Sequence, residues 1–230
     1  QTSKNLFFVK KSIVLVIALT TYNESFASNG MISTGYGQNS GLSGTSIAMP
    51  LDSLTIASNP AGLAKVGSRI DADIRIFKGE ATNSFLSETN TNKIDDIVLI
   101  PEFGFNYEKD DKTNIGLAIY GSGLSAEYKN PILPIPGLDD SSSSISVINI
   151  SPTLTKKVGS NLYLGVSPIF AYSMIKTEGI PGKDNTDDDA TGVGLKLGSI
   201  YDINENFSLG ATYTSKIKMS KWKKYENDSL

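Results

Sequence analysis

Few residues in this sequence have the types and spacing that catalysis or metal binding requires. Its 230 residues include no His and no Cys, which removes imidazole and thiolate metal ligands, Cys nucleophiles and Ser-His-Asp triads. The densest carboxylate run, Asp184–Asp189, resembles a calcium loop only in its acidity, because it lacks the Gly and the distal Glu. We therefore predict no enzyme, no catalytic residue, no metal site and no cofactor. The missing His disfavours a hydrolase, although a further part of a longer protein could supply one.

The charge balance limits the partners. The sequence has 21 Lys+Arg against 24 Asp+Glu, a net charge of −3 and a pI near 5.1. Because it contains no basic block, it offers no surface that neutralises phosphates, and we predict no nucleic-acid partner. Hydrophobic residues make up 39% of the sequence, which permits a sizeable core.

The first 27 residues have the order of a secretory signal peptide. A basic segment, Lys4–Lys11, precedes a short apolar stretch over residues 12–19, and small residues follow at Ser25 and Ala27. The apolar stretch is shorter than the ~20 residues that span a bilayer as a helix. We predict export with cleavage after Ala27. The alternative is that this segment forms a buried core helix.

Residues 28–68 differ in composition from the rest of the sequence. They are rich in Gly, Ser, Thr and Ala and show poor periodicity. Small side chains allow close backbone packing, which suits a confined space such as the lumen of a barrel; a flexible leader is the alternative. Asn59-Pro60-Ala61 interrupts this segment. Because Asn caps helices and Pro fits the first helical position, we predict one or two helical turns over Pro60–Lys65.

From Arg69 onward, apolar and polar residues alternate with a period of two, which indicates half-buried strands. Seven segments show this alternation. Their apolar faces run over Ile70–Ile76, Leu99–Tyr107, Ile115–Ile119, Ile148–Leu154, Leu162–Tyr172, Val193–Leu197 and Phe207–Ile217.

Three features of these segments favour a transmembrane antiparallel β-barrel over a soluble sandwich. The longer segments reach the length that crosses a bilayer at a tilt, and their polar faces are rich in Gly, Ser and Thr, as a lumen requires. Long connections (78–96, 123–143, 177–190) alternate with short ones (108–113, 157–161, 203–206), as in outer-membrane barrels. Aromatic residues near the strand ends fit the two interfacial girdles: Tyr107, Tyr120, Tyr163, Tyr172, Tyr201 and Trp222. Seven strands are too few to close a barrel, so we predict that residues 69–230 are the N-terminal part of one.

The order of these features resembles the FadL family of outer-membrane transporters, also called the toluene-transport or outer membrane protein P1 family. The resemblance covers nearly all the predicted mature chain. It rests on the small-residue segment with Asn59-Pro60-Ala61 and on four later stretches, namely Gly123-Leu-Ser-Ala-Glu-Tyr128, Ile148-Asn-Ile-Ser-Pro152, Asn161-Leu-Tyr-Leu-Gly165 and Phe207-Ser-Leu-Gly-Ala-Thr-Tyr-Thr-Ser-Lys216. The resemblance implies a fourteen-stranded barrel, of which seven strands are half.

The resemblance also implies a transport route. Hydrophobic substrate enters from outer loops, sits above an N-terminal hatch (residues 28–68) and leaves sideways where the third strand kinks inward. Asn59, Pro60 and Ala61 match the hatch motif, and the alternative is a helix cap with no transport role. The third strand is expected to end in Gly121-Ser-Gly123, and Gly tolerates the backbone of a kink or bulge. The alternative is that Gly121 and Gly123 begin a loop.

Two further groups of residues are candidates for substrate contact. The loop after the third strand carries four apolar residues, which are costly to expose unless they bind something: Ile132, Leu133, Ile135 and Leu138. Packing against neighbouring loops is the alternative. Lys196 and Lys216 point to the lumen by parity, but neither matches a family motif. The residue that would meet a substrate carboxylate is therefore unassigned.

These observations predict passive transport of long-chain fatty acids or other hydrophobic compounds across the bacterial outer membrane. The expected partners are hydrophobic small molecules and outer-membrane lipid, and the full-length barrel is expected to be monomeric. The alternative from a different class is a surface adhesin or structural barrel that acts through its long outer loops.

Overall fold

The computed structural model describes residues 35–42, 46–77, 80–85, 88–93, 98–128, 141–178 and 186–225. All of them belong to one compact unit, residues 32–230. The predicted signal peptide (1–27) and the apolar loop residues Ile132, Leu133, Ile135 and Leu138 lie outside the described residues. Within the described part, no helix is long and apolar enough to cross a membrane.

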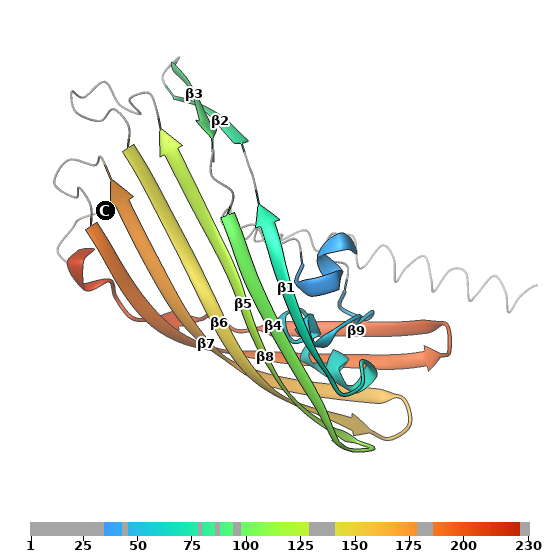
Figure 1. The fold of residues 1–230 in the computed structure, drawn as a ribbon. Helices are drawn as coiled ribbons and strands as arrows, with labels where there is room; N and C mark the ends of the chain where they lie inside the picture. Colours follow the sequence, from blue (N-terminus) through green and yellow to red (C-terminus); the bar gives the residue numbers. More distant parts are fainter. Residues whose placement is uncertain are drawn as a thin grey trace, which may run out of the picture. The chain divides into compact units, whose positions relative to one another are not determined.

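Short 3₁₀ helices come first and antiparallel strands follow (Figure 1). The helices are η1 (Gly37–Leu42), η2 (Ser53–Ala57) and η3 (Pro60–Lys65), with η4 (Lys223–Tyr225) at the other end. The strands are β1 (Arg69–Phe77), β2 (Glu80–Phe85), β3 (Glu88–Lys93), β4 (Val98–Asp110), β5 (Thr113–Tyr128), β6 (Ser141–Val158), β7 (Leu162–Glu178), β8 (Thr186–Asn204), β9 (Phe207–Thr214) and β10 (Lys218–Met219). The helix predicted over Pro60–Lys65 is confirmed as η3.

One antiparallel sheet contains every predicted alternating segment. Its order is β1-β4-β5-β6-β7-β8, and β9 and β10 both pair with the free edge of β8. Each of the seven segments therefore occupies one position in the sheet, and the sheet is open between β1 and β9. A separate hairpin, β2–β3, lies within residues 78–96, which the sequence predicted to be a loop. That prediction was wrong, because the Thr and Asn residues of this polar stretch pair as strands.

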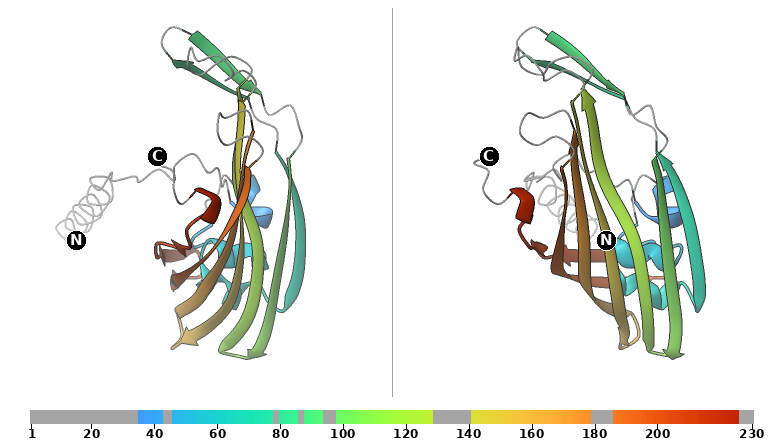
Figure 2. Two further views of the ribbon diagram at one scale, coloured as in Figure 1. Left: turned by 90° about the vertical axis from the view of Figure 1, so that its left-hand side faces the viewer. Right: turned by 60° about the vertical axis from the view of Figure 1, so that its left-hand side comes forward.

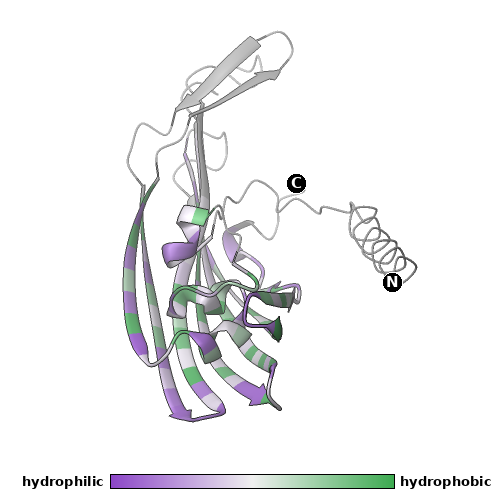
Figure 3. Cartoon of the chain, turned by 90° about the vertical axis from the view of Figure 1, so that its right-hand side faces the viewer, coloured by the Kyte–Doolittle hydropathy of each residue, from purple (hydrophilic) through white to green (hydrophobic). Residues whose placement is uncertain are grey.

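Hydrophobic and hydrophilic residues alternate along the strands (Figure 3), and the two faces of the sheet differ in exposure as this alternation predicted. On one face, apolar side chains are exposed, among them Ile70, Leu99, Leu154, Phe170 and Leu209. On the other face, small or polar residues are buried, among them Asn106, Ser151, Thr153, Thr155 and Ser167. An exposed apolar face is stable only against lipid, whereas the buried polar face encloses other parts of the protein. Tyr120 departs from the predicted girdles, because its side chain is buried on the inner face.

The sheet curves around η1, η2 and η3, which lie on its concave face (Figure 2). Leu54, Ile56 and Leu63 of these helices form a small apolar core with Ala118 and Tyr120 of β5. Glycines on the inner face of the strands let the helices approach closely. A Cβ atom at Gly116 would lie 2.6 Å from a methyl carbon of Leu63, and one at Gly165 would collide with the backbone nitrogen of Ala61. The small residues of the inner face are therefore sites of contact with the helices.

Candidate functional site

The Asn59-Pro60-Ala61 motif joins the helical segment to the sheet. Asn59 Oδ1 accepts a hydrogen bond from the Ala61 amide at 3.1 Å, which caps η3 as predicted. Its Nδ2 donates to the carbonyls of Ile47 (2.7 Å) and Ser199 of β8 (3.0 Å). Asn59 is fully buried. The side chain thus satisfies three backbone groups on three segments, which a simple helix cap does not do.

Two more wall residues hold the same motif. Thr155 Oγ1 on β6 donates to the Pro60 carbonyl at 2.6 Å. On β8, a Cβ atom at Gly198 would collide with Asn59 Oδ1 and lie 2.7 Å from Pro60 Cδ. Glycine at position 198 is therefore required by the packing of the motif, and the motif is bound to both β6 and β8.

Replacing Asn59 with Ala should destabilise this contact by about 2–4 kcal/mol, because it removes the cap and the side-chain hydrogen bonds to the Ile47 and Ser199 carbonyls. The measurement is the urea midpoint of the purified full-length protein together with protease cleavage within residues 46–68. Asn59→Ser keeps a capping oxygen and should recover about 1 kcal/mol of the loss. An Asn59→Ala protein with wild-type stability would contradict this role.

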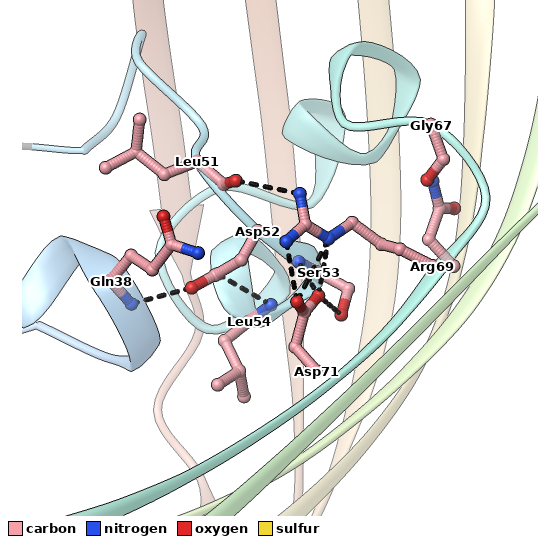
Figure 4. Close-up of polar contacts among 9 residues, drawn as sticks. Gln38, Leu51, Asp52, Ser53, Leu54, Gly67, Arg69 and Asp71 are labelled. Carbon is pink, nitrogen blue, oxygen red and sulfur yellow. Dashed lines mark hydrogen bonds and ion pairs between the residues drawn. The ribbon is translucent and has the colours of Figure 1, made fainter.

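A carboxylate network ties the other side of the helical segment to β1 (Figure 4). Asp71 of β1 accepts hydrogen bonds from the Ser53 amide (2.9 Å) and the Ser53 hydroxyl (2.6 Å). Arg69 pairs with the same carboxylate at 2.7 Å and also donates to the Leu51 carbonyl at 3.1 Å. Next to this pair, Asp52 caps η2 by accepting from the Leu54 amide at 3.0 Å. Burial raises the pKa of Asp52 above its ordinary value.

The hydrogen-bond ladder between β4 and β5 ends partway along the two strands. Direct pairing between them stops at Phe103 and Ile119. Beyond that point β4 remains paired with β1 up to Val98, and β5 remains paired with β6 up to Tyr128. The two pairs of strands diverge from there in the right-hand view of Figure 2. We call this interruption the β4–β5 gap.

Gly121 and Gly123 lie on the β5 side of the β4–β5 gap. A Cβ atom at Gly121 would lie 3.2 Å from Ile100 Cγ2, so the Ile100 side chain of β4 fills the space beside this glycine. A Cβ atom at Gly123 would lie 3.0 Å from the Ile145 carbonyl oxygen of β6. The strand does not end at Gly123, and neither glycine begins a loop, because β5 pairs with β6 in one continuous register through Tyr128. The interruption lies in the β4–β5 ladder, and β5 itself carries no bulge towards β6.

Aromatic and charged side chains meet at the base of the β4–β5 gap. The rings of Tyr36 and Tyr120 form an edge-to-face pair with centroids 4.7 Å apart. The Arg75 guanidinium lies 5.5 Å from the Tyr36 ring centroid and forms an ion pair with buried Glu102. The Gly37 amide donates to the same carboxylate at 2.9 Å. The sequence analysis did not identify these residues as a group.

These observations describe a curved sheet whose concave face holds η1, η2 and η3 as an internal plug. The hydrogen-bond ladder between β4 and β5 ends next to this plug. The sequence matches the family described as outer membrane protein transport protein (OMPP1/FadL/TodX) over residues 14–230. The chain belongs to this family. Comparison with curated protein sequences gave no match.

Solved structures similar to this FadL-family chain show the same fold. The "TodX deltaS2S3 mutant monoaromatic hydrocarbon channel" has a TM-score of 0.60 at 16% identity, covering 73% of this chain and 51% of its own. The P. putida toluene transporter TodX has a TM-score of 0.55 at 18% identity, with coverages of 74% and 53%. A Pseudomonas aeruginosa FadL homologue has a TM-score of 0.53 at 18% identity, and the match covers 75% of this chain and 49% of the homologue. The chain spans about half the length of these structures. The predicted family and the predicted β-barrel fold are confirmed.

The two lysines predicted to face the lumen have different positions in this FadL-family chain. Lys196 is buried on the inner face, and its Nζ donates to the Ala57 carbonyl at the end of η2. It therefore holds the helical segment. Lys216 is exposed and lies in an irregular stretch between β9 and β10. Among the described residues, no group of three or more His, Cys, Asp or Glu residues is placed to hold a metal ion.

Proposed function

We propose that the full-length protein transports hydrophobic compounds across the outer membrane through a hatch-plugged barrel with a lateral exit. The observation that carries this proposal is the end of the β4–β5 ladder at Phe103 and Ile119, immediately above the helical plug. Unpaired backbone groups in a barrel wall are costly in lipid. An interruption at this place is therefore consistent with a passage between lumen and bilayer.

Fixation of the hatch supports a sideways route. In this proposal residues 1–27 are a cleaved signal peptide, 28–68 the hatch and 69–230 part of the barrel wall. Hydrogen bonds join the hatch to β1, β4, β6 and β8, through Asp71, Asn106, Thr155 and Lys196. Substrate that cannot displace so many bonds must leave above the hatch, and Gly121 and Gly123 are the proposed sites of the lateral gate.

We further propose long-chain fatty acids or other hydrophobic compounds as substrates. Solved structures with this fold include proteins described as a toluene transporter and a monoaromatic hydrocarbon channel, and this supports apolar cargo. First contact is assigned to the apolar residues of the outer loop, namely Ile132, Leu133, Ile135 and Leu138. Asn59, Pro60 and Ala61 form the floor of the route, and the complete barrel acts as a monomer in contact with outer-membrane lipid.

Uptake assays with Gly121 variants test this function. Gly121→Leu needs the space that Ile100 now fills, at a cost of about 1–3 kcal/mol, and should lower uptake of radiolabelled fatty acid severalfold by obstructing the gap. Gly121→Ala adds a single methyl group and should retain most of the uptake. Both variants must reach the surface in equal amounts. Unchanged uptake in Gly121→Leu, together with loss of cell attachment after exchange of residues 123–143, would favour the adhesin.

A further inference from the structure

The edge strand that pairs with β8 contains one extra residue. Lys196 of β8 pairs with Thr214, and Val193 pairs with Lys218, so three steps on β8 oppose four on the edge strand. Ser215 bridges the irregular stretch: its amide donates to the Leu195 carbonyl at 2.8 Å, and its hydroxyl accepts from the Leu195 amide at 2.9 Å. This is a β-bulge, and it reverses which side chains face outward beyond it.

The reversal changes the position of two residues. Ile217 packs over the inner face, where a Cβ atom at Gly194 would lie 3.0 Å from Ile217 Cγ1. Lys218, at an even-numbered position that simple alternation places in the lumen, lies instead on the outer face beside Val193. A lysine on the lipid-facing surface of a barrel is costly at mid-depth and tolerated at the interface.

Lys218 closes one end of an apolar groove on this outer face. Two adjacent rows of outward side chains line the groove, which has a volume of about 560 Å³. The first row runs across four strands in register and the second lies beside it: Ile150, Phe170, Val193 and Lys218, then Ile148, Tyr172, Thr191 and Ser220. Phe170 and Val193 are half exposed, at 50% and 55%. The groove is therefore an open, mostly apolar channel with one cation, Lys218, and three hydroxyl-bearing residues, Tyr172, Thr191 and Ser220.

The groove lies near the outward-facing side of the membrane, close to the boundary between acyl chains and headgroups. Phe170 is eight residues beyond Leu162, where β7 leaves the short turn on the inner side of the membrane. Eight residues of strand cover about 26 Å, or about 20 Å of height at a tilt of about 40°. The apolar band of such barrels is ~25 Å tall, so Lys218 lies near the outer edge of that band, where its flexible stem can carry the ammonium group to the headgroups.

The segment that follows adds positive charge at the same level. Five lysines lie in the short stretch around Trp222, and all are exposed: Lys216, Lys218, Lys221, Lys223 and Lys224. The opposing charges are Asp187–Asp189 at the start of β8; Asp188 accepts from the Lys224 amide at 2.7 Å, and the Asp187 carbonyl accepts from the Lys224 side chain. Within the described residues 186–189 and 216–224, five lysines stand against three aspartates, so this part of the surface carries a net positive charge.

We propose that this groove binds an anionic lipid of the outer-facing leaflet. One acyl chain lies along Ile150, Phe170 and Val193, and the phosphate headgroup meets Lys218, with the hydroxyl groups of Thr191 and Ser220 beside it. Charge complementarity selects the headgroup, and the row of apolar side chains accommodates the chain. The site faces lipid and is separate from the transport route, so it holds whether or not the protein transports fatty acids.

Photo-crosslinking in vesicles tests this site directly. The full-length protein carries a benzophenone amino acid in place of Phe170 and is reconstituted in equimolar phosphatidylglycerol and phosphatidylcholine with identical acyl chains. A lysine near an anionic headgroup contributes about 1 kcal/mol, which predicts a preference of about fivefold for crosslinks to phosphatidylglycerol. Lys218→Gln should reduce this preference about fivefold, to near one.

Two variants control for charge and for folding. Lys218→Arg keeps the cation and should keep the preference for phosphatidylglycerol. Lys156→Gln removes an exposed lysine near the short turns at the other end of β6 and should leave the preference unchanged. Two results would overturn the proposal. One is equal crosslinking of both lipids by the protein that retains Lys218, and the other is a preference for phosphatidylglycerol that persists in Lys218→Gln. Either result would show that Lys218 only extends into water.

Discussion

If residues 28–68 act as the proposed hatch, replacing Gly198 with Leu is expected to dislodge them and to make the outer membrane permeable to polar compounds. A Cβ atom at this position would already collide with Asn59 Oδ1 and lie 2.7 Å from Pro60 Cδ, and a Leu side chain needs far more space. Overpacking of this kind costs about 3 kcal/mol, which shifts the equilibrium towards a displaced hatch by roughly a hundredfold.

The measurement is the sensitivity of cells that express the full-length protein to a large hydrophilic antibiotic. The Gly198→Leu strain should become sensitive, and protease should cleave residues 46–68 in isolated membranes. Gly41→Leu is the matched control, because a Cβ atom at Gly41 would have no neighbour within 4 Å. If Gly198→Leu cells stayed as resistant as wild-type cells with equal surface abundance, the hatch could not be held by the contacts described above.

The strands could be predicted from the sequence because each one separates lipid from lumen. This requirement imposes an alternation that each segment carries locally, and all seven positions of the sheet follow from it. Strand ends were less predictable. The β6 strand begins in the run Ser141–Ser144, whose residues pair with β5 and β7 but carry no apolar alternation.

The short helix η3 could also be predicted, because capping depends on neighbours in the sequence. Asn59 and Pro60 suffice to place η3. The bonds from Asn59 to Ser199 and from Lys196 to Ala57 join residues about 140 positions apart, so no local pattern reports them. Parity gave the correct face for Lys196 and identified it as a lumen residue, but it could not identify its partner.

Two other features could not be predicted from local sequence patterns: the Tyr36–Tyr120 contact at the base of the β4–β5 gap, and the β-bulge between β9 and β10. Tyr36 and Tyr120 meet only because the segment that precedes β1 packs against β5, whereas a girdle position is the natural expectation for a Tyr near a strand end. The extra residue between Thr214 and Lys218 leaves no sequence signature, since Ser and Lys fit either face of an edge strand. Beyond it, every face assigned by alternation is reversed.

In the proposed function, substrate leaves through the β4–β5 gap, and a cysteine pair across the gap tests this exit. These 230 residues contain no Cys, so Ile100→Cys with Gly121→Cys introduces the only pair within them. Ile100 Cγ2 would lie 3.2 Å from a Cβ atom at position 121, so side chains at these two positions meet across the gap, and completeness of the disulfide is checked by thiol labelling. The disulfide would fasten β4 to β5 where the ladder is interrupted. A second pair, Phe105→Cys with Leu117→Cys, joins residues that are already direct partners in the ladder and serves as the control.

Fatty acid uptake by the same cells before and after reduction is the decisive measurement. We expect background uptake in the oxidised Ile100→Cys/Gly121→Cys protein, full recovery after a reducing agent, and no dependence on reduction in the control pair. Wild-type uptake through a barrel whose gap is shown to be fully crosslinked would contradict the proposed exit, because the substrate would then have left by another path.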